Sequence, residues 1–356
     1  MVSMSLADRI LGSLVAAGMG DAMGAPTEAL SRVEIMERYG GYVTTFLAPA
    51  LGSYYAADNI AGEITDDASQ MYEMAQAIIE TGGELTVEAA AKALVRWAQT
   101  HTKFYPRDAG PTTRFVIQEL LAGKDPVEVG KTGGVYGRGV SNGAAMRVAA
   151  AGLIHPSDLD GAVKTAIAMT APSHGTQIGY AGACAIACGI ARALSEDASV
   201  FSVLQACFYG ARAGEQYGMV HGRVAPGHSV IPLLGQAIKV AAEAESMEDV
   251  LIQMERKVGN HGDINVSVPC AVGLFAWADG DPMQTIIAAT NVGNDTDSIA
   301  CIAGSLAGAL KGFKAIDQEL YQQFKAANPA FDFERVAQDL YAIASRNLGA
   351  GRADLV

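Results

Sequence analysis

Apolar and polar residues alternate along most of the chain with the spacing of an amphipathic α-helix, at every third or fourth position. Runs with a period of two, the pattern of half-buried strands, are nearly absent. Alanine-rich helical segments follow one another without an internal repeat, a low-complexity segment or a Pro/Ser-rich linker. This pattern predicts an all-α fold, a compact multi-helix bundle, and we expect residues 1–356 to form a single domain.

Several expected helices have recognisable boundaries. Ser246 precedes an acidic first turn, Asp281-Pro282 places a capping residue before proline at the first helical position, and Ser157-Asp158 precedes another acidic turn. The glycine turn around Gly20 is expected to end the first helix. Three prolines are expected where helices stop or start: Pro111, Pro172 and Pro329.

Glycine and other small residues have two expected uses. The helices expected over 179–189 and 300–309 are rich in Ala, Gly, Ser and Cys, which allows helix backbones to approach closely. Three glycine-rich stretches are expected to interrupt helices: 133–143, 214–227 and 259–262. The 214–227 stretch matches no motif, and both a substrate-specific loop and a surface connection are open for it.

The composition excludes several classes of protein. Half of the residues are hydrophobic and only 18% are charged, so the chain is not disordered. Its apolar stretches are shorter than the ~20 residues of a membrane span. The net charge of −13 argues against a nucleic-acid partner. The five cysteines form no metal-binding or paired pattern and are expected to be buried, reduced thiols of a cytoplasmic protein.

Two acidic clusters each precede an apolar helical segment. Thr65-Asp66-Asp67 stands before the segment 71–79, and Asp295-Thr296-Asp297-Ser298 stands before 299–310. Each cluster alone fits an ordinary helix N-cap with acids at the positive end of the helix. Together they offer four carboxylates and several hydroxyls, which suits two Mg²⁺ or Mn²⁺ ions better than zinc or copper.

A third acidic segment lies near the N-terminus, where Gly20-Asp21 is followed by Glu28. A surface helix end is the alternative interpretation of this segment. The loop 133–143 has backbone N–H groups that could hold phosphate, with an arginine close by, or it is a plain turn. Its residues of interest are Gly133, Gly134, Gly137, Arg138, Ser141, Asn142 and Gly143.

Four motifs in this order resemble the ADP-ribosylglycohydrolase family over nearly the whole chain. They are Gly-Asp-x-x-Gly-x-x-x-Glu from Gly20, Thr-Asp-Asp from Thr65, Ser-Asn-Gly-Ala-Ala-Met-Arg from Ser141, and Gly-Asn-Asp-Thr-Asp-Ser from Gly293. The resemblance implies an all-α fold with a binuclear magnesium centre in a cleft, and hydrolysis of a bond at the anomeric carbon of a ribose.

The resemblance also implies roles for individual residues. The metal ligands would be Thr65, Asp66, Asp67, Asp295, Asp297 and Ser298. Glu28 falls where the family has an acid near the ribose, and it or a metal-binding aspartate, Asp66 or Asp297, would move the proton. Asn142 and Gly143 lie in a loop that approaches the ligand, and His174 falls where some members place a histidine beside the substrate. Asn294 stands where glycine is usual, and Ser298 where threonine is common.

The sequence thus predicts a magnesium-dependent glycohydrolase that cleaves the anomeric bond of an ADP-ribosyl group on a protein or small molecule. One alternative is a hydrolase of ribonucleosides or other small ribosides on the same fold. The other is a catalytically inactive binding or immunity protein. No nucleic-acid or membrane partner is expected, and the sequence does not indicate an oligomeric state.

Overall fold

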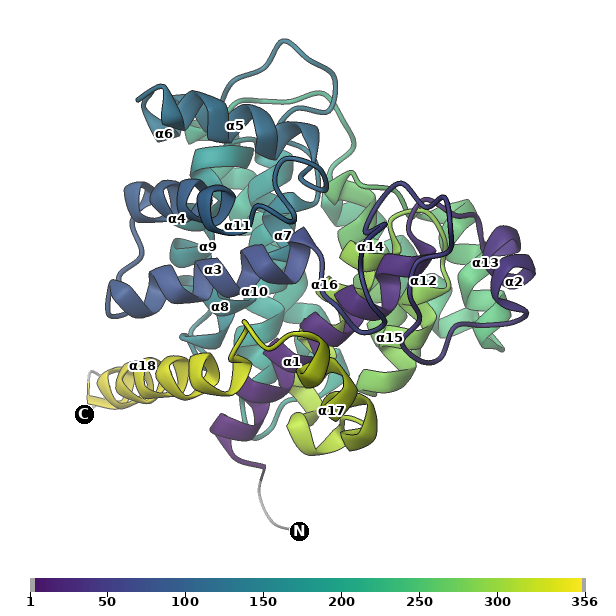
Figure 1. The fold of residues 1–356 in the computed structure, drawn as a ribbon. Coiled ribbons are helices and arrows are strands. Elements are labelled where there is room, and N and C mark those ends of the chain that lie inside the picture. The colour runs from purple at the N-terminus through teal and green to yellow at the C-terminus, as the bar shows by residue number, and fades with distance from the viewer. Residues whose placement is uncertain (1–3, 354–356) are drawn as a thin grey trace.

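The computed structural model describes residues 4–353, and it is built from α-helices (Figure 1). Eighteen α-helices and two short 3-10 helices account for its regular structure. Within these residues there is no strand, and the isolated bridges Ser141–Asp263 and Thr176–Arg223 are the only β-type pairings. The all-α prediction is therefore confirmed.

The elements follow one another in the order α1 (Leu6–Gly24), η1 (Ala25–Thr27), α2 (Arg32–Tyr39), α3 (Asp66–Glu80), α4 (Val87–Thr100), α5 (Pro111–Leu121), α6 (Pro126–Gly130), α7 (Gly143–Met146), α8 (Ala149–Leu153), α9 (Leu159–His174), α10 (Gln177–Ala193), α11 (Val200–His221), α12 (Val230–Glu243), α13 (Met247–Lys257), α14 (Ile264–Trp277), α15 (Pro282–Thr290), α16 (Thr296–Lys311), η2 (Phe313–Ala315), α17 (Gln318–Ala327) and α18 (Phe333–Ala353).

Helices α1 and α16 pack together through the middle of the molecule (Figure 1). Their contact is made of small residues, because a Cβ on Gly20 would lie only 2.3 Å from the carbonyl oxygen of Ala300. A Cβ on Gly24 would lie 2.5 Å from the Cα of Asp297. Only glycine permits this approach, and it brings the end of α1 against the beginning of α16.

Helices α10 and α11 form a second close pair. A Cβ on Gly214 would lie 2.3 Å from the carbonyl oxygen of Tyr180, and one on Gly218 would lie 2.4 Å from the Cα of Gln177. These glycines are inside α11, so the prediction that the 214–227 stretch interrupts a helix was wrong for its first half. The glycines there serve helix packing rather than a loop.

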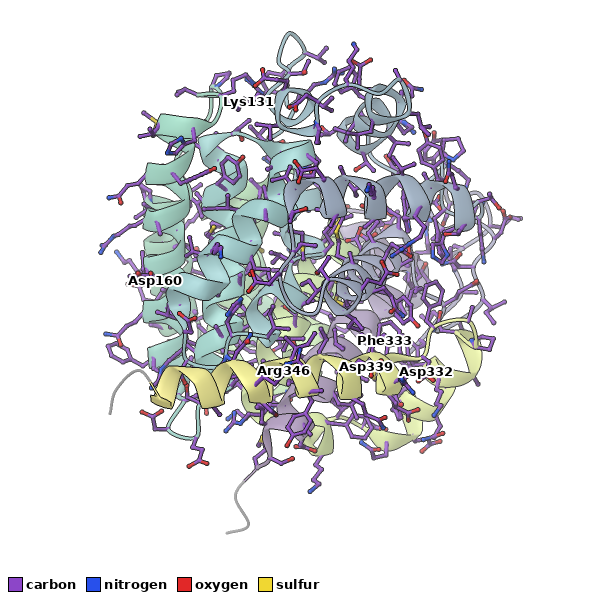
Figure 2. The ribbon with its side chains drawn as sticks, turned by 90° about the vertical axis from the view of Figure 1, so that its left-hand side faces the viewer. Lys131, Asp160, Asp332, Phe333, Asp339 and Arg346 are labelled. Atoms are coloured by element: carbon purple, nitrogen blue, oxygen red, sulfur yellow. The ribbon has the colours of Figure 1, made fainter. Side chains whose placement is uncertain are left out.

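The remaining helices surround these pairs. Helices α12 and α14 pack against each other, α15 packs on α16, and α18 contacts α1 and α3. Figure 2 shows α18 from Phe333 to Arg346 lying along one side of the molecule. One continuous set of buried hydrophobic residues runs from Ile10 in α1 to Ala344 in α18. All five cysteines are buried and free, and across residues 4–353 no helix has both the length and the apolar character of a membrane span.

Several predicted helix boundaries are confirmed. The side chains of Ser246, Asp281 and Asp158 cap α13, α15 and α9, and Pro111 occupies the first turn of α5. Pro329 lies between α17 and α18. Pro172 was expected at a boundary, but it lies inside the last turn of α9, where little helix remains for it to break.

The end of α1 also differs from the prediction. The helix continues through Gly20 and Asp21 to Gly24. Gly20 is used for contact with α16, and its backbone stays helical. Asp21 is therefore a buried helical residue, with no exposed side-chain surface, rather than part of a turn.

Candidate active site

One cleft of about 300 Å³ gathers the acidic residues from distant parts of the chain. Its wall includes Glu28 after η1, Asp66 and Asp67 at the start of α3, and Asp295, Asp297 and Ser298 at the start of α16. Ser141, Asn142 and Gly143 line it from the segment at the start of α7. Two acidic clusters near opposite ends of the chain thus share one cavity, because α1, α3 and α16 converge there.

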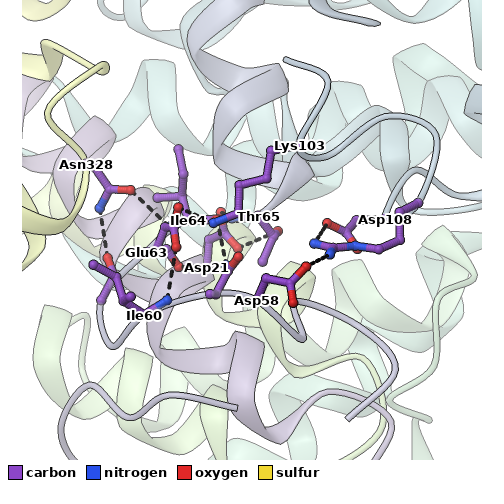
Figure 3. Close-up of polar contacts among 12 residues, drawn as sticks. Asp21, Asp58, Ile60, Glu63, Ile64, Thr65, Lys103, Asp108 and Asn328 are labelled. Atoms are coloured by element: carbon purple, nitrogen blue, oxygen red, sulfur yellow. Dashed lines mark hydrogen bonds and ion pairs between the residues drawn. The ribbon is translucent and has the colours of Figure 1, made fainter. Parts of the chain in front are cut away.

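The start of α3 is held by Asp21 (Figure 3). The Thr65 backbone N–H donates to Asp21 Oδ2 at 2.9 Å, the Thr65 hydroxyl donates to Asp21 Oδ1 at 2.6 Å, and the Ala68 N–H donates to Oδ2 at 3.0 Å. Burial raises the pKa of Asp21 to about 6, against the lowering effect of these bonds. Asp21 therefore fixes where the two acids that follow Thr65 enter the cleft.

Thr65 itself caps α3, since its hydroxyl oxygen accepts from the Asp67 N–H at 3.2 Å. It is buried and stands behind the cleft wall rather than on it. Of the two lone pairs on a hydroxyl oxygen, one remains after this bond. The N-cap interpretation is confirmed for Thr65, and it leaves the Asp66 and Asp67 carboxylates to other partners.

The start of α16 is different, because Asp295 occupies the N-cap position without making a side-chain capping bond. Its carboxylate accepts from Asn142 Nδ2 at 2.7 Å instead. The 259–262 stretch supports both residues: the Asp295 N–H donates to the Asn260 carbonyl, and the Asn142 N–H donates to the Gly262 carbonyl. The N-cap interpretation therefore does not explain this acidic cluster.

Glu28 is brought to the same place by a short backbone pairing. The Ala29 N–H donates to the Asn294 carbonyl, and the Asn294 N–H donates to the Leu30 carbonyl, both at 2.7 Å. Ala29 and Asn294 have φ values of 62° and 64°, in the left-handed region. Asparagine tolerates this conformation better than most residues, which is consistent with its standing where the family resemblance implies glycine. Carboxylate oxygens of Glu28, Asp295 and Asp297 lie within 4.8 Å of one another.

The electrostatics of the cleft favour a bound cation. Burial raises the pKa of Glu28, Asp66, Asp67 and Asp297 well above the usual range, and neighbouring carboxylates raise each further. Among residues 4–353, the buried oxygens Asp67 Oδ2 and Asp297 Oδ1 have no hydrogen-bond donor. Clustered carboxylates with unpaired oxygens are costly unless they are protonated or bind a positive ion. All-oxygen donors of this kind suit Mg²⁺ or Mn²⁺.

The segment 141–143 lines the same cleft with polar, uncharged groups. Ser141 lines the cleft, and its hydroxyl lies 2.8 Å from Nε2 of His174. His174 is completely buried behind Ser141, so the structure places it one side chain away from the cavity. Burial and the nearby Arg147 lower the pKa of His174 well below its usual value, which makes it a neutral imidazole.

The first part of the 133–143 loop lies elsewhere. The Arg138 guanidinium stacks on the Phe115 ring, with 3.7 Å from Cζ to the ring centroid, and the Arg138 carbonyl accepts from Arg223. Gly137 lines a different cavity of about 180 Å³, with Tyr136, His228 and His261. Among the described residues of this loop, the acidic cleft is lined by Ser141, Asn142 and Gly143. The other predicted residues do not line it: Gly133, Gly134, Gly137 and Arg138.

Some cleft residues were missed by sequence reasoning. Tyr55 and Asp108 line the cleft, and Asp108 is paired with Arg107, which also contacts Asp58 (Figure 3). No motif marks these loop positions. Arg147, behind the cleft, ends the motif that starts at Ser141, but the sequence analysis assigned it no role. The signal was present, because Arg147 is the one charged residue in the otherwise small and apolar segment 143–151.

Comparison with known proteins identifies the family of the chain. The family model described as ADP-ribosylglycohydrolase matches residues 3–350. An uncharacterized protein of Escherichia coli K12, YegU, is 30% identical over 94% of this chain and 96% of its own length. ADP-ribosylhydrolase ARH3 of Bos taurus is 25% identical, covering 96% of this chain and 94% of its own.

A solved structure titled ADP-ribosylglycohydrolase-related protein complex superposes with a TM-score of 0.68 at 21% identity, covering 96% of this chain and 99% of that chain. At this identity the likeness concerns the fold. With a family model that matches nearly every residue, the chain belongs to the ADP-ribosylglycohydrolase family, a family of hydrolases.

Proposed function

We propose that this protein is a divalent-metal-dependent glycohydrolase that cleaves the anomeric bond of an ADP-ribosyl group, carried by a protein or a small molecule. The observation that carries the proposal is the set of buried carboxylates in one cleft, with unpaired oxygens on Asp67 and Asp297. Family membership supports the substrate class, since the similar bovine protein is named an ADP-ribosylhydrolase.

Two Mg²⁺ or Mn²⁺ ions fit the donor set of the cleft. Asp66, Asp67, Asp295, Asp297 and Ser298 line the cleft and would hold them. Thr65 does not line the cleft, and as the N-cap of α3 it would position Asp66 and Asp67. When bound, such ions supply an activated water and positive charge beside ribose hydroxyls. They also relieve the repulsion that raises the carboxylate pKa values.

The residues of the chain have separate tasks in this proposal. Glu28 lies beside Asp295 and Asp297, and burial together with these carboxylates raises its pKa well above the usual range, which favours a protonated side chain. It can give that proton to the leaving group or take one from the attacking water. Asp66 or Asp297 is the other candidate for the proton transfer. The surrounding carboxylates stabilise the positive charge that develops on the ribose in an oxocarbenium-like transition state.

The testing experiment is a substrate panel of ADP-ribosylated proteins, ADP-ribosylated small molecules and nucleosides, each with Mg²⁺ and with EDTA. We expect Mg²⁺-dependent release of ADP-ribose, which EDTA abolishes. Turnover of phosphate-free nucleosides alone would instead assign the riboside hydrolase. Tight metal binding without turnover of any riboside would assign an inactive binding protein.

A further inference from the structure

A buried chain of polar contacts runs through Arg147 and joins two residues that line the cleft, Asp66 and Ser141. Arg147 Nη1 donates to Gln70 Oε1 at 2.6 Å, and Gln70 Nε2 donates to Asp66 Oδ2 at 2.9 Å. On its other side, Arg147 Nη2 donates to the Ser173 hydroxyl oxygen at 2.6 Å. Arg147 has no exposed surface, so this cation acts only through its neighbours.

The direction of the next hydrogen bond follows from two distances. The Ser173 hydroxyl lies 2.8 Å from His174 Nδ1 and 3.4 Å from the Thr170 carbonyl, so its single hydrogen is better placed toward the imidazole. Arg147 Nη2, itself a donor, also lies 3.5 Å from Nδ1. A hydrogen on Nδ1 would face the guanidinium N–H, so Nδ1 is the unprotonated acceptor.

The neutral ring then carries its hydrogen on Nε2. That hydrogen points to the Ser141 oxygen 2.8 Å away, and Ser141 therefore accepts from His174. The Ser141 hydroxyl hydrogen is left for the cleft that this residue lines. Successive bonds from Arg147 through Ser173 and His174 align in one direction, and a cation at their head strengthens them.

We propose that Ser141 is a directed hydrogen-bond donor that recognises a phosphoryl oxygen of the substrate, with Arg147, Ser173 and His174 as its positioning residues. A chain of donors that begins at a cation favours a negatively charged acceptor over a neutral one. The identity of the acceptor rests on the proposed function, whereas the direction of the chain does not.

The direction can be measured without activity. In protein with ¹⁵N-labelled histidine, long-range ¹H–¹⁵N spectra report the tautomer of each ring, and His174→Gln assigns the His174 signals. We expect a neutral ring protonated on Nε2. A ring protonated on Nδ1, or a charged imidazolium at neutral pH, would overturn the proposal even if the protein hydrolyses ADP-ribosyl groups.

Recognition is tested by calorimetric binding of ADP-ribose and of adenosine in Mg²⁺. Ser141→Ala should weaken ADP-ribose binding about tenfold or more, the usual effect of losing a hydrogen bond to a charged group, and should change adenosine binding little. Ser141→Thr, which keeps a hydroxyl, is the matched control. Unchanged ADP-ribose affinity in Ser141→Ala, or an equal loss for adenosine, contradicts a phosphoryl contact.

The positioning role of His174 is tested by two amide substitutions. His174→Gln places its amide nitrogen near the original Nε2 and should keep most of the affinity, whereas His174→Asn does not reach Ser141 and should resemble Ser141→Ala. The double variant Ser141→Ala/His174→Asn should be no weaker than Ser141→Ala, because the two residues act as a unit. Additive losses would overturn the coupling.

If the wild-type protein fails to bind ADP-ribose, the proposed function and the phosphoryl contact fail together. The tautomer of His174 still decides the direction of the hydrogen-bond chain from Arg147 to Ser141.

Discussion

Gly24 and Asp297 lie so close together that a Cβ added to Gly24 would stand 2.5 Å from the Cα of Asp297. The contact joins the end of α1 to the first turn of α16. Glu28 follows four residues after Gly24, so this approach also decides how near Glu28 comes to Asp297.

Gly24→Ala should therefore destabilise the protein by about 3 kcal/mol, as overpacking of a well-packed contact does, despite the better helix propensity of alanine. It should also weaken the site by separating α1 from α16. Gly235→Ala is the matched control, because Gly235 lies in α12 with nothing within 4 Å of an added Cβ, and it should stabilise by about 0.5–1 kcal/mol. Urea unfolding measures both changes, and equal effects would argue against a close contact.

Glu28→Gln should lower kcat at least ~10²-fold, the usual contribution of general acid–base catalysis. The amide has nearly the same shape but cannot transfer the proton, so Mg²⁺ should still raise the melting temperature. Steady-state kinetics and thermal melts on the same preparation check this. Near-normal turnover would reduce Glu28 to a structural role beside Asn294.

The two acidic clusters should behave as one site. Asp66→Asn and Asp297→Asn should each abolish turnover and reduce the rise in melting temperature that Mg²⁺ produces, since a ligand of the native state stabilises it. The double variant should be scarcely worse than either single variant, because residues of one site are not additive. Additive changes that do not depend on Mg²⁺ would show two independent helix ends.

The stability of the metal-free protein should fall as pH rises from acid to neutral. The folded-state pKa values of Glu28, Asp66, Asp67 and Asp297 are raised, so these four groups bind more protons in the folded than in the unfolded state across that range. They outnumber His155 and His174, whose lowered pKa values act in the opposite direction. Each deprotonation of a carboxyl group therefore favours unfolding.

Metal needs the deprotonated carboxylates, so the stabilisation by Mg²⁺ should grow over the same range. Melting curves between about pH 5 and 8, with Mg²⁺ and with EDTA, measure both slopes. Slopes of the opposite sign would contradict the buried carboxylate cluster.

Local signals in the sequence were sufficient for the fold class and for many helix starts. Asp158, Ser246 and Asp281 cap their helices as expected, because a short polar side chain can satisfy the free N–H groups of a first turn without help from the rest of the molecule. The helical period and the four family motifs are also properties of the sequence alone, and the family model confirms the resemblance.

Tertiary structure decided the features that depend on a distant partner. Gly20 does not end α1, and Gly214 does not interrupt α11, because each glycine provides space for another helix rather than freedom for its own backbone. The same is true of chemistry. Thr65 and Asp295 both stand at the start of an acidic cluster that precedes a helix. Thr65 caps its helix, whereas the Asp295 carboxylate accepts a hydrogen bond from Asn142. Likewise, the burial of Arg147 and the direction of its hydrogen bonds arise only when α3, α7 and α9 meet. Sequence alone determined which residues are able to cap a helix, bind a metal or donate a hydrogen bond. Packing determined which partner each of these residues contacts, because the partners come from distant parts of the chain.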